Sequence, residues 1–124
     1  MGDFGNNNIV TIFILRLTMQ NQKREITTEK AMEKVQGGAL FVDVREEDEI
    51  RQLAFDVPEI MHIPLSKFVK RFAEIPKDRD VVVVCNGGGR SLTATDFLLS
   101  QGFTTVSNLS GGIIQWADNN FPLT

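Results

Sequence analysis

VVVVCNGGGRS, residues 81–91, places a strand, a cysteine, a glycine loop and an arginine in immediate succession. Four consecutive β-branched residues predict a strand buried on both faces, as the strands of parallel sheets are. The run stops at Cys85, the only cysteine of the chain, and three glycines follow, which allow a tight turn with inward-facing N–H groups. The stretch therefore predicts an anion-binding loop around a cysteine at the end of a buried strand.

Strands and helices alternate at short spacing on both sides of this loop. The predicted strands are residues 39–44, 60–63, 81–84 and 103–109, and the predicted helices are residues 27–36, 46–53, a segment starting at Pro64, 91–101 and 113–119. This alternation predicts an α/β fold with a parallel sheet and helices on both faces. Ligands of such sheets bind beyond the carboxyl ends of the strands, which is where Cys85 lies.

The first 24 residues carry weaker signals than the rest. We divide the chain into an N-terminal extension or added edge strand, residues 1–24, and a single domain, residues 25–124. The apolar run at residues 9–17 is interrupted by Arg16 and is too short to span a membrane. It also has no positive charge before it and no small-residue cleavage pattern after it, so we expect no membrane association and a cytoplasmic protein.

Composition excludes several classes of function. A chain of 124 residues with a net charge of −3 and no basic stripe does not fit nucleic-acid binding. A single cysteine rules out a disulfide within the chain, and one cysteine with one histidine forms no metal-ligand cluster. We expect no metal and no cofactor. Any chemistry at the cysteine must hand its product to another molecule.

The loop residues suit a nucleophilic thiolate. Backbone N–H groups, a helix N-terminus and Arg90 all favour the anionic form of a cysteine. An arginine can also hold an oxyanion through two parallel hydrogen bonds. A lone cysteine at a strand end is commonly an inert small hydrophobic residue. The glycine run and the arginine favour the functional interpretation, because packing requires neither.

Several motifs of this chain resemble, in the same order, those of rhodanese (sulfurtransferase) domains. The resemblance covers roughly residues 26–122 and is specific as a set. It implies a small three-layer α/β domain with a central, mainly parallel sheet and an active-site loop that starts at cysteine. The motifs are Asp43-Val44-Arg45, His62-Ile63-Pro64-Leu65-Ser66, Cys85-x4-Arg90-Ser91, Gly102-Phe103 and Asn108-Leu109-x-Gly111-Gly112-Ile113-x-x-Trp116.

The resemblance implies a sulfurtransferase that acts in two steps. The Cys85 thiolate would attack the sulfane sulfur of a donor such as thiosulfate, and a thiol or cyanide acceptor would then remove the sulfur. Arg90 would orient the donor. An alternative is a sulfur-relay or binding module that delivers persulfide sulfur to a protein partner. The persulfide would be held by the loop residues Asn86, Gly87, Gly88, Gly89, Arg90 and Ser91.

Phosphatases and arsenate reductases of this fold have a cysteine loop that resembles Cys-x5-Arg. Here four residues separate the cysteine from the arginine, and this shorter loop favours a sulfur substrate over a phosphate. Many family members carry Gly-His-Ile-Pro-Gly-Ala before the third strand. Residues 54–60 (AFDVPEI) replace that segment, which leaves recognition of the donor or partner open, and His62 is interpreted as structural. We expect Asp43 and Arg45 to support the strand end. The acidic residues 46–49 are interpreted as a solvated face at a helix start.

Overall fold

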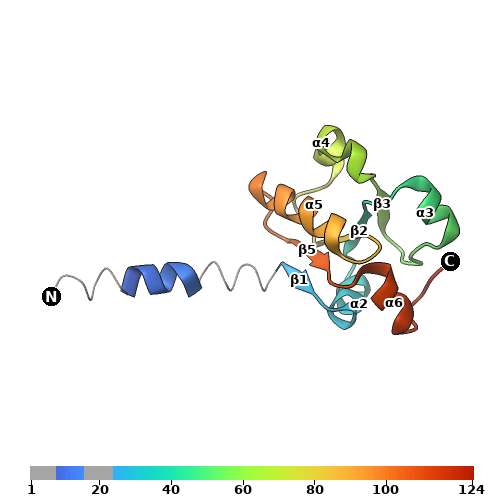
Figure 1. Cartoon of the computed structure of the whole chain (residues 1–124), viewed down its shortest axis with the longest axis horizontal. Helices are drawn as coiled ribbons and strands as arrows, with labels where there is room; N and C mark the ends of the chain where they lie inside the picture. Colours follow the sequence, from blue (N-terminus) through green and yellow to red (C-terminus); the bar gives the residue numbers. More distant parts are fainter. Residues whose placement is uncertain (1–7, 16–23) are drawn as a thin grey trace.

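Five parallel strands form the centre of the molecule in a computed structural model that describes residues 8–15 and 24–124. Their spatial order is β1-β5-β4-β2-β3, and every neighbouring pair is parallel. The α/β fold with a parallel sheet is therefore confirmed (Figure 1). The strands are β1 (Glu25–Ile26), β2 (Leu40–Asp43), β3 (Ile60–His62), β4 (Val81–Val84) and β5 (Val106–Leu109).

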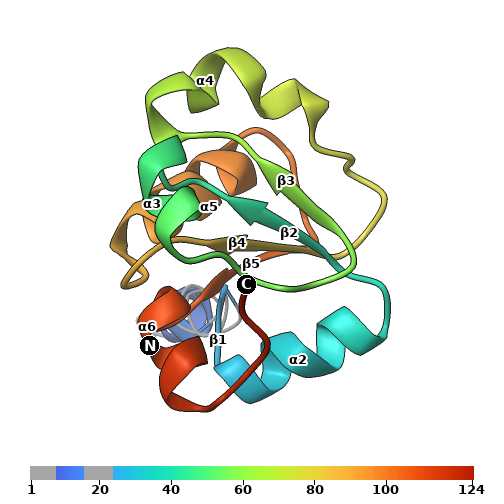
Figure 2. The same ribbon diagram turned by 90° about the vertical axis from the view of Figure 1, so that its right-hand side faces the viewer.

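Helices cover both faces of this sheet, with α4 and α5 on one side and α2 and α6 on the other (Figure 2). The segment that starts at Pro64 is broken into two 3₁₀ turns around one short α-helix. The helical elements are α2 (Thr28–Gln36), α3 (Glu47–Gln52), η1 (Leu65–Lys67), α4 (Phe68–Arg71), η2 (Phe72–Glu74), α5 (Gly89–Ser100) and α6 (Gly112–Asp118).

The side chains of strand β4 are buried on both faces of the sheet. Its alternate residues belong to different core clusters, because successive side chains of a strand point to opposite faces. Val81, Val83 and Cys85 pack on the face that carries α4 and α5, whereas Val82 and Val84 pack on the face that carries α2 and α6. The cysteine side chain therefore lies on the same side of the sheet as α5.

The N-terminal segment differs from one sequence-based alternative. Residues 8–15 form a helix, so an added edge strand is wrong for these residues, while residues 16–23 lie outside the described part of the chain. The edge strand is instead β1, which begins at Glu25 and pairs with β5. No helix within residues 8–15 or 24–124 is long and apolar enough to cross a membrane. The division at residue 24 stays a prediction.

Candidate active site at the Cys85 loop

Strand β4 and helix α5 hold the two ends of the cysteine loop. Cys85 directly follows the last residue of β4, and α5 begins at Gly89, two residues before the predicted start at Ser91. Gly88 caps this helix in the left-handed conformation, with φ of 104°. A side chain there would be strained, and its Cβ would come 3.1 Å from the backbone nitrogen of Gly111. The turn into α5 therefore requires glycine at position 88.

The other two glycines of the loop are less demanding than the sequence suggested. A Cβ atom added at Gly87 or at Gly89 would have no neighbour within 4 Å. Both residues are exposed, whereas Gly88 is buried. Of the three glycines, only Gly88 lies where a side chain would strain the loop.

Three polar groups surround the sulfur of Cys85. The backbone N–H groups of Gly88 and Ser91 donate to Sγ at 3.2 and 3.3 Å, and the Ser91 hydroxyl lies 3.1 Å from it. The same hydroxyl donates to the Gly88 carbonyl at 3.2 Å. A hydroxyl has one proton, so the Ser91 hydroxyl can accept a hydrogen bond from the Cys85 thiol while it donates to the Gly88 carbonyl. Alternatively, it can donate to a Cys85 thiolate. The sulfur is thus placed where an anion is stabilised, at the start of α5.

Cys85 is only 1% exposed, so the loop residues cover the sulfur. Among the described residues no group of three or more histidine, cysteine, aspartate or glutamate side chains could hold a metal ion. The site is built from backbone N–H groups, one hydroxyl and one thiol.

Helix α6 holds the loop from the other side. The N–H groups of Ile113 and Ile114 donate to the carbonyls of Cys85 and Asn86 at 2.9 and 3.2 Å. Gly112 makes this close approach possible, because a Cβ atom there would overlap both carbonyl oxygens. Gly112 belongs to the last of the motifs quoted from the sequence, and that motif gave no sign of the contact with the cysteine loop.

Asn108, at the end of β5, is a second support that the sequence-based analysis did not assign to the site. Its fully buried side-chain amide donates to the Gly88 carbonyl at 3.1 Å and to the Glu25 carboxylate at 2.8 Å. The Gly88 carbonyl is thereby fixed, and with it the direction of the peptide groups around the sulfur. The motif Asn108-Leu109 was a signal for this residue, but only the fold brings it to the loop.

Arg90 forms a two-pronged ion pair with Glu49 of α3. Both terminal nitrogens of the guanidinium donate to the carboxylate, each at 2.7 Å. These hydrogen bonds lower the pKa of Glu49 to about 2 and raise the pKa of Arg90 above its ordinary value. The interpretation of residues 46–49 as a solvated face is therefore wrong for Glu49, because the fold places α3 against the cysteine loop.

Asp43 and Arg45 form a buried ion pair at the end of β2. Each side chain is 2% exposed, and the Arg45 guanidinium donates to Asp43 at 2.9 Å and to the Leu53 carbonyl at 3.0 Å. The His62 ring lies 2.7 Å from the Arg45 carbonyl. These contacts join the ends of β2, α3 and β3. They support the structural roles expected for all three residues.

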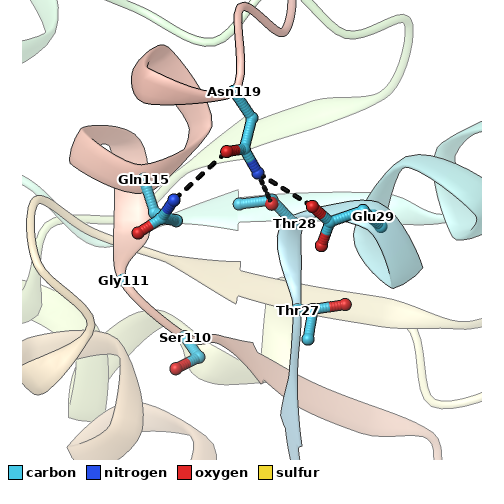
Figure 3. A pocket seen from close by; sticks show the side chains of 7 residues that line it. All are labelled: Thr27, Thr28, Glu29, Ser110, Gly111, Gln115 and Asn119. Carbon is cyan, nitrogen blue, oxygen red and sulfur yellow. Dashed lines mark hydrogen bonds between the residues drawn. The ribbon is translucent and has the colours of Figure 1, made fainter.

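A pocket of about 250 Å³ lies between the start of α2 and helix α6, outside the cysteine loop (Figure 3). The Asn119 amide points into it and donates to Glu29 at 3.0 Å and to the Thr28 hydroxyl. Gln115 in turn donates to Asn119 at 3.2 Å. None of the predicted site residues lines this pocket. Its polar groups bond to one another and join the two helices.

Comparison with known proteins identifies a family over most of this chain. The sequence model described as "Rhodanese-like domain" matches residues 27–119. A protein named sulfurtransferase from Allochromatium vinosum is 44% identical over 84 residues, which cover 68% of this chain and 77% of that protein. Thiosulfate sulfurtransferase 18 of Arabidopsis thaliana is 32% identical over an alignment of 102 positions, which covers 72% of this chain and 74% of that protein.

A solved structure gives the same picture of the fold. The crystal structure of a rhodanese-related protein from Thermoplasma volcanium is similar with a TM-score of 0.74 and 26% sequence identity. The similarity covers 82% of this chain and 97% of that one.

Proposed function

The chain belongs to the rhodanese-like domain family, and from that premise we propose that it transfers sulfane sulfur from a small donor to an acceptor through a persulfide on Cys85. Sulfurtransferases among its relatives support sulfur transfer in general. The observation that carries the proposal is the set of two N–H groups and one hydroxyl around Sγ. Such groups stabilise a thiolate before reaction and a persulfide anion after it.

In the first step the Cys85 thiolate attacks the outer sulfur of the donor. A new S–S bond forms at Cys85, the donor's own bond to that sulfur breaks, and the leaving group keeps the electron pair of that bond. With thiosulfate as donor the leaving group is sulfite. The N–H groups of Gly88 and Ser91 hold the negative charge near Sγ, so the step needs no general base once the thiolate is present.

In the second step a thiophilic acceptor removes the outer sulfur and restores the Cys85 thiolate. Cyanide would take this sulfur as thiocyanate, and a thiolate would take it as a persulfide. Because the chain has no other cysteine, the sulfur must leave to another molecule. The acceptor is therefore a small thiophile or a protein cysteine.

The mass of the intact protein after incubation with excess thiosulfate tests the first step. We expect wild type to gain one sulfur, about 32 Da, which a reductant removes, and Cys85→Ser to gain nothing. Alkylation of Cys85 in the same samples checks that reagents reach the buried thiol. Absence of a persulfide from every sulfane donor, with a thiol that is alkylated, would contradict the proposal.

A relay to a protein partner is the second candidate, favoured by the deep burial of Cys85 under its loop. Its signature is a persulfide that forms readily but is released slowly to cyanide and small thiols. Single-turnover release, followed by the loss of the added sulfur, separates the two candidates. Fast release to small acceptors would exclude an obligatory protein partner.

A further inference from the structure

The charge around Cys85 is balanced by a residue from another element. Arg90 is the only cationic side chain in the loop from residue 85 to residue 91. Its two terminal nitrogens each donate to Glu49 at 2.7 Å. The side chains are 36% and 32% exposed, so this pair lies at the surface of the loop rather than beneath it. The loop consequently presents a neutral ion pair, not a free guanidinium, to an approaching donor.

Glu49 is held in this position from its own side as well. Its Oε2 accepts a hydrogen bond from the backbone N–H of Glu46 at 2.9 Å, at the start of α3. The other end of α3 is tied by Arg45, which donates to the Leu53 carbonyl. Hydrogen bonds from Arg90 and from the start of α3 therefore hold the Glu49 carboxylate in place beside the loop.

We propose that Glu49 determines the donor class of this sulfurtransferase by neutralising Arg90, so that the preferred donor is a small organic persulfide, which reacts in its uncharged R–S–SH form, rather than an oxyanion such as thiosulfate. This inference rests on the proposed function, because it concerns the same Cys85 reaction. An oxyanion dianion gains from an unpaired guanidinium and is repelled by a carboxylate next to it. The R–S–SH form is insensitive to both charges, and this form, not the R–S–S⁻ anion that predominates at neutral pH, has the outer sulfur that a thiolate attacks.

The reaction with such a donor balances without another reagent. The Cys85 thiolate attacks the terminal sulfur of R–S–SH, the S–S bond of the donor breaks, and R–S⁻ leaves with the electron pair. The products are the Cys85 persulfide, which carries the proton of the former donor, and a small thiolate that takes a proton from water. Sulfur changes partners, and no external oxidant or reductant is needed.

Glu49→Gln tests the proposal, because glutamine keeps the size and the acceptor oxygen but removes the charge. The rate of persulfide formation is measured by intact mass in a single turnover, with thiosulfate and with 2-hydroxyethyl persulfide. We expect the variant to load from thiosulfate about tenfold faster than wild type. From the organic persulfide it should load within about twofold of wild type, because the fraction of this donor in the uncharged R–S–SH form is the same for both proteins. Glu47→Gln is the matched control on the same helix, because Glu47 is 81% exposed and makes only a 4.0 Å contact with Arg51. Its rates should equal those of wild type.

The dependence on salt gives a second readout that a purely structural role of Glu49 would not change. Between ionic strengths of about 0.01 and 1 M, loading from thiosulfate should slow severalfold in Glu49→Gln, where a free guanidinium attracts the dianion. In wild type it should not slow, since the site has no net attraction to screen. This wild-type measurement also holds if the variant folds poorly.

Two outcomes separate this inference from the proposed function. Equal loading of wild type and Glu49→Gln from thiosulfate, with the same salt dependence, would overturn the role of Glu49 and leave sulfur transfer intact. No persulfide from either donor in any of the proteins would overturn the proposed function itself.

Discussion

Two residues from distant parts of the chain, Gly112 and Glu49, contact the loop that begins at Cys85 and help to set its structure. Gly112 lets the start of α6 approach the cysteine loop, since its φ of 56° and the neighbouring carbonyls leave no room for a side chain. Glu49 holds the guanidinium of Arg90. One residue acts by having no side chain and the other through its charge. Both can be tested by single substitutions.

Gly112→Ala is expected to destabilise the protein by about 3 kcal/mol, because a Cβ atom would overlap the carbonyl oxygens of Cys85 and Asn86 and strain the backbone. Urea unfolding measures the change. Gly89→Ala is the control, because a Cβ there has no neighbour within 4 Å, and it should change the free energy of unfolding by less than about 0.5 kcal/mol. Equal effects of the two substitutions would contradict the contact.

The Glu49–Arg90 pair predicts a dependence of stability on pH. The pKa of Glu49 falls from 4.5 to about 2 on folding, so the folded protein favours the charged form. A group of this kind stabilises the fold above pH 4.5, and the contribution disappears as the pH falls toward about 2. Because both side chains are about one-third exposed, we expect only about 1 kcal/mol at neutral pH.

Urea unfolding of wild type and Glu49→Gln at a series of pH values measures this contribution. The difference in free energy of unfolding should be constant from pH 5 to pH 8 and shrink only below about pH 4.5. A difference that stays constant from pH 5 down to about pH 2 would show that the pKa of Glu49 is not lowered.

At the scale of elements, the end of β2 is the junction that aligns the site. Asp43 and Arg45 follow one another closely at this strand end, and Arg45 also reaches the last turn of α3, while His62 joins β3 to the same junction. These contacts position helix α3 so that its Glu49 side chain can pair with Arg90. The buried ion pair thus contributes to the site without touching the sulfur.

Asp43→Asn is expected to destabilise the protein by about 3 kcal/mol, because it leaves the Arg45 guanidinium buried without its counter-charge. Asp80→Asn provides a matched comparison, since Asp80 pairs with Lys34 at 3.3 Å on the surface and should cost less than about 1 kcal/mol. Urea unfolding of both variants at neutral pH gives the two values. Similar losses would mean that burial of the Asp43 pair has no energetic consequence.

At the scale of the whole molecule, the parallel sheet brings the site residues together at the carboxyl ends of its strands. Cys85, Asn108 and the buried Asp43 pair lie at the carboxyl ends of β4, β5 and β2, which are neighbours in the sheet. Two core clusters fill the space between the sheet and its helices. Among the described residues, the members of both clusters lie between Ile26 and Leu123.

Removal of residues 1–23 should therefore leave a folded domain, with a thermal midpoint within about 2 °C of the full chain and an unchanged rate of persulfide formation. Removal of residues 1–26 also deletes β1 and the Glu25–Asn108 hydrogen bond. We expect this longer deletion to lower the midpoint by about 5 °C or more. Calorimetry of both deletion variants distinguishes them. Equal midpoints would show that β1 does not stabilise the sheet.

Local sequence patterns were sufficient for most of the elements. The valine run and the alternating strand and helix patterns on both sides of it predicted elements close to those observed, because each pattern depends on neighbouring residues. Two elements differ from those predicted. The segment after Pro64 breaks into short turns, and the N-terminal apolar run is helical at residues 8–15, where apolar composition alone does not separate helix from strand.

The sequence by itself determined the α/β class, the position of Cys85 at a strand end and the loop that follows it, because each of these arises from contiguous residues. Only the tertiary structure decided that Glu49 faces Arg90, that Asn108 holds the Gly88 carbonyl and that Gly112 lies against the peptide of Cys85. These partners are 41, 20 and 27 positions apart in the printed sequence. No local pattern specifies such pairs, because their distance is set by the order of the strands in the sheet and by the packing of helices against it.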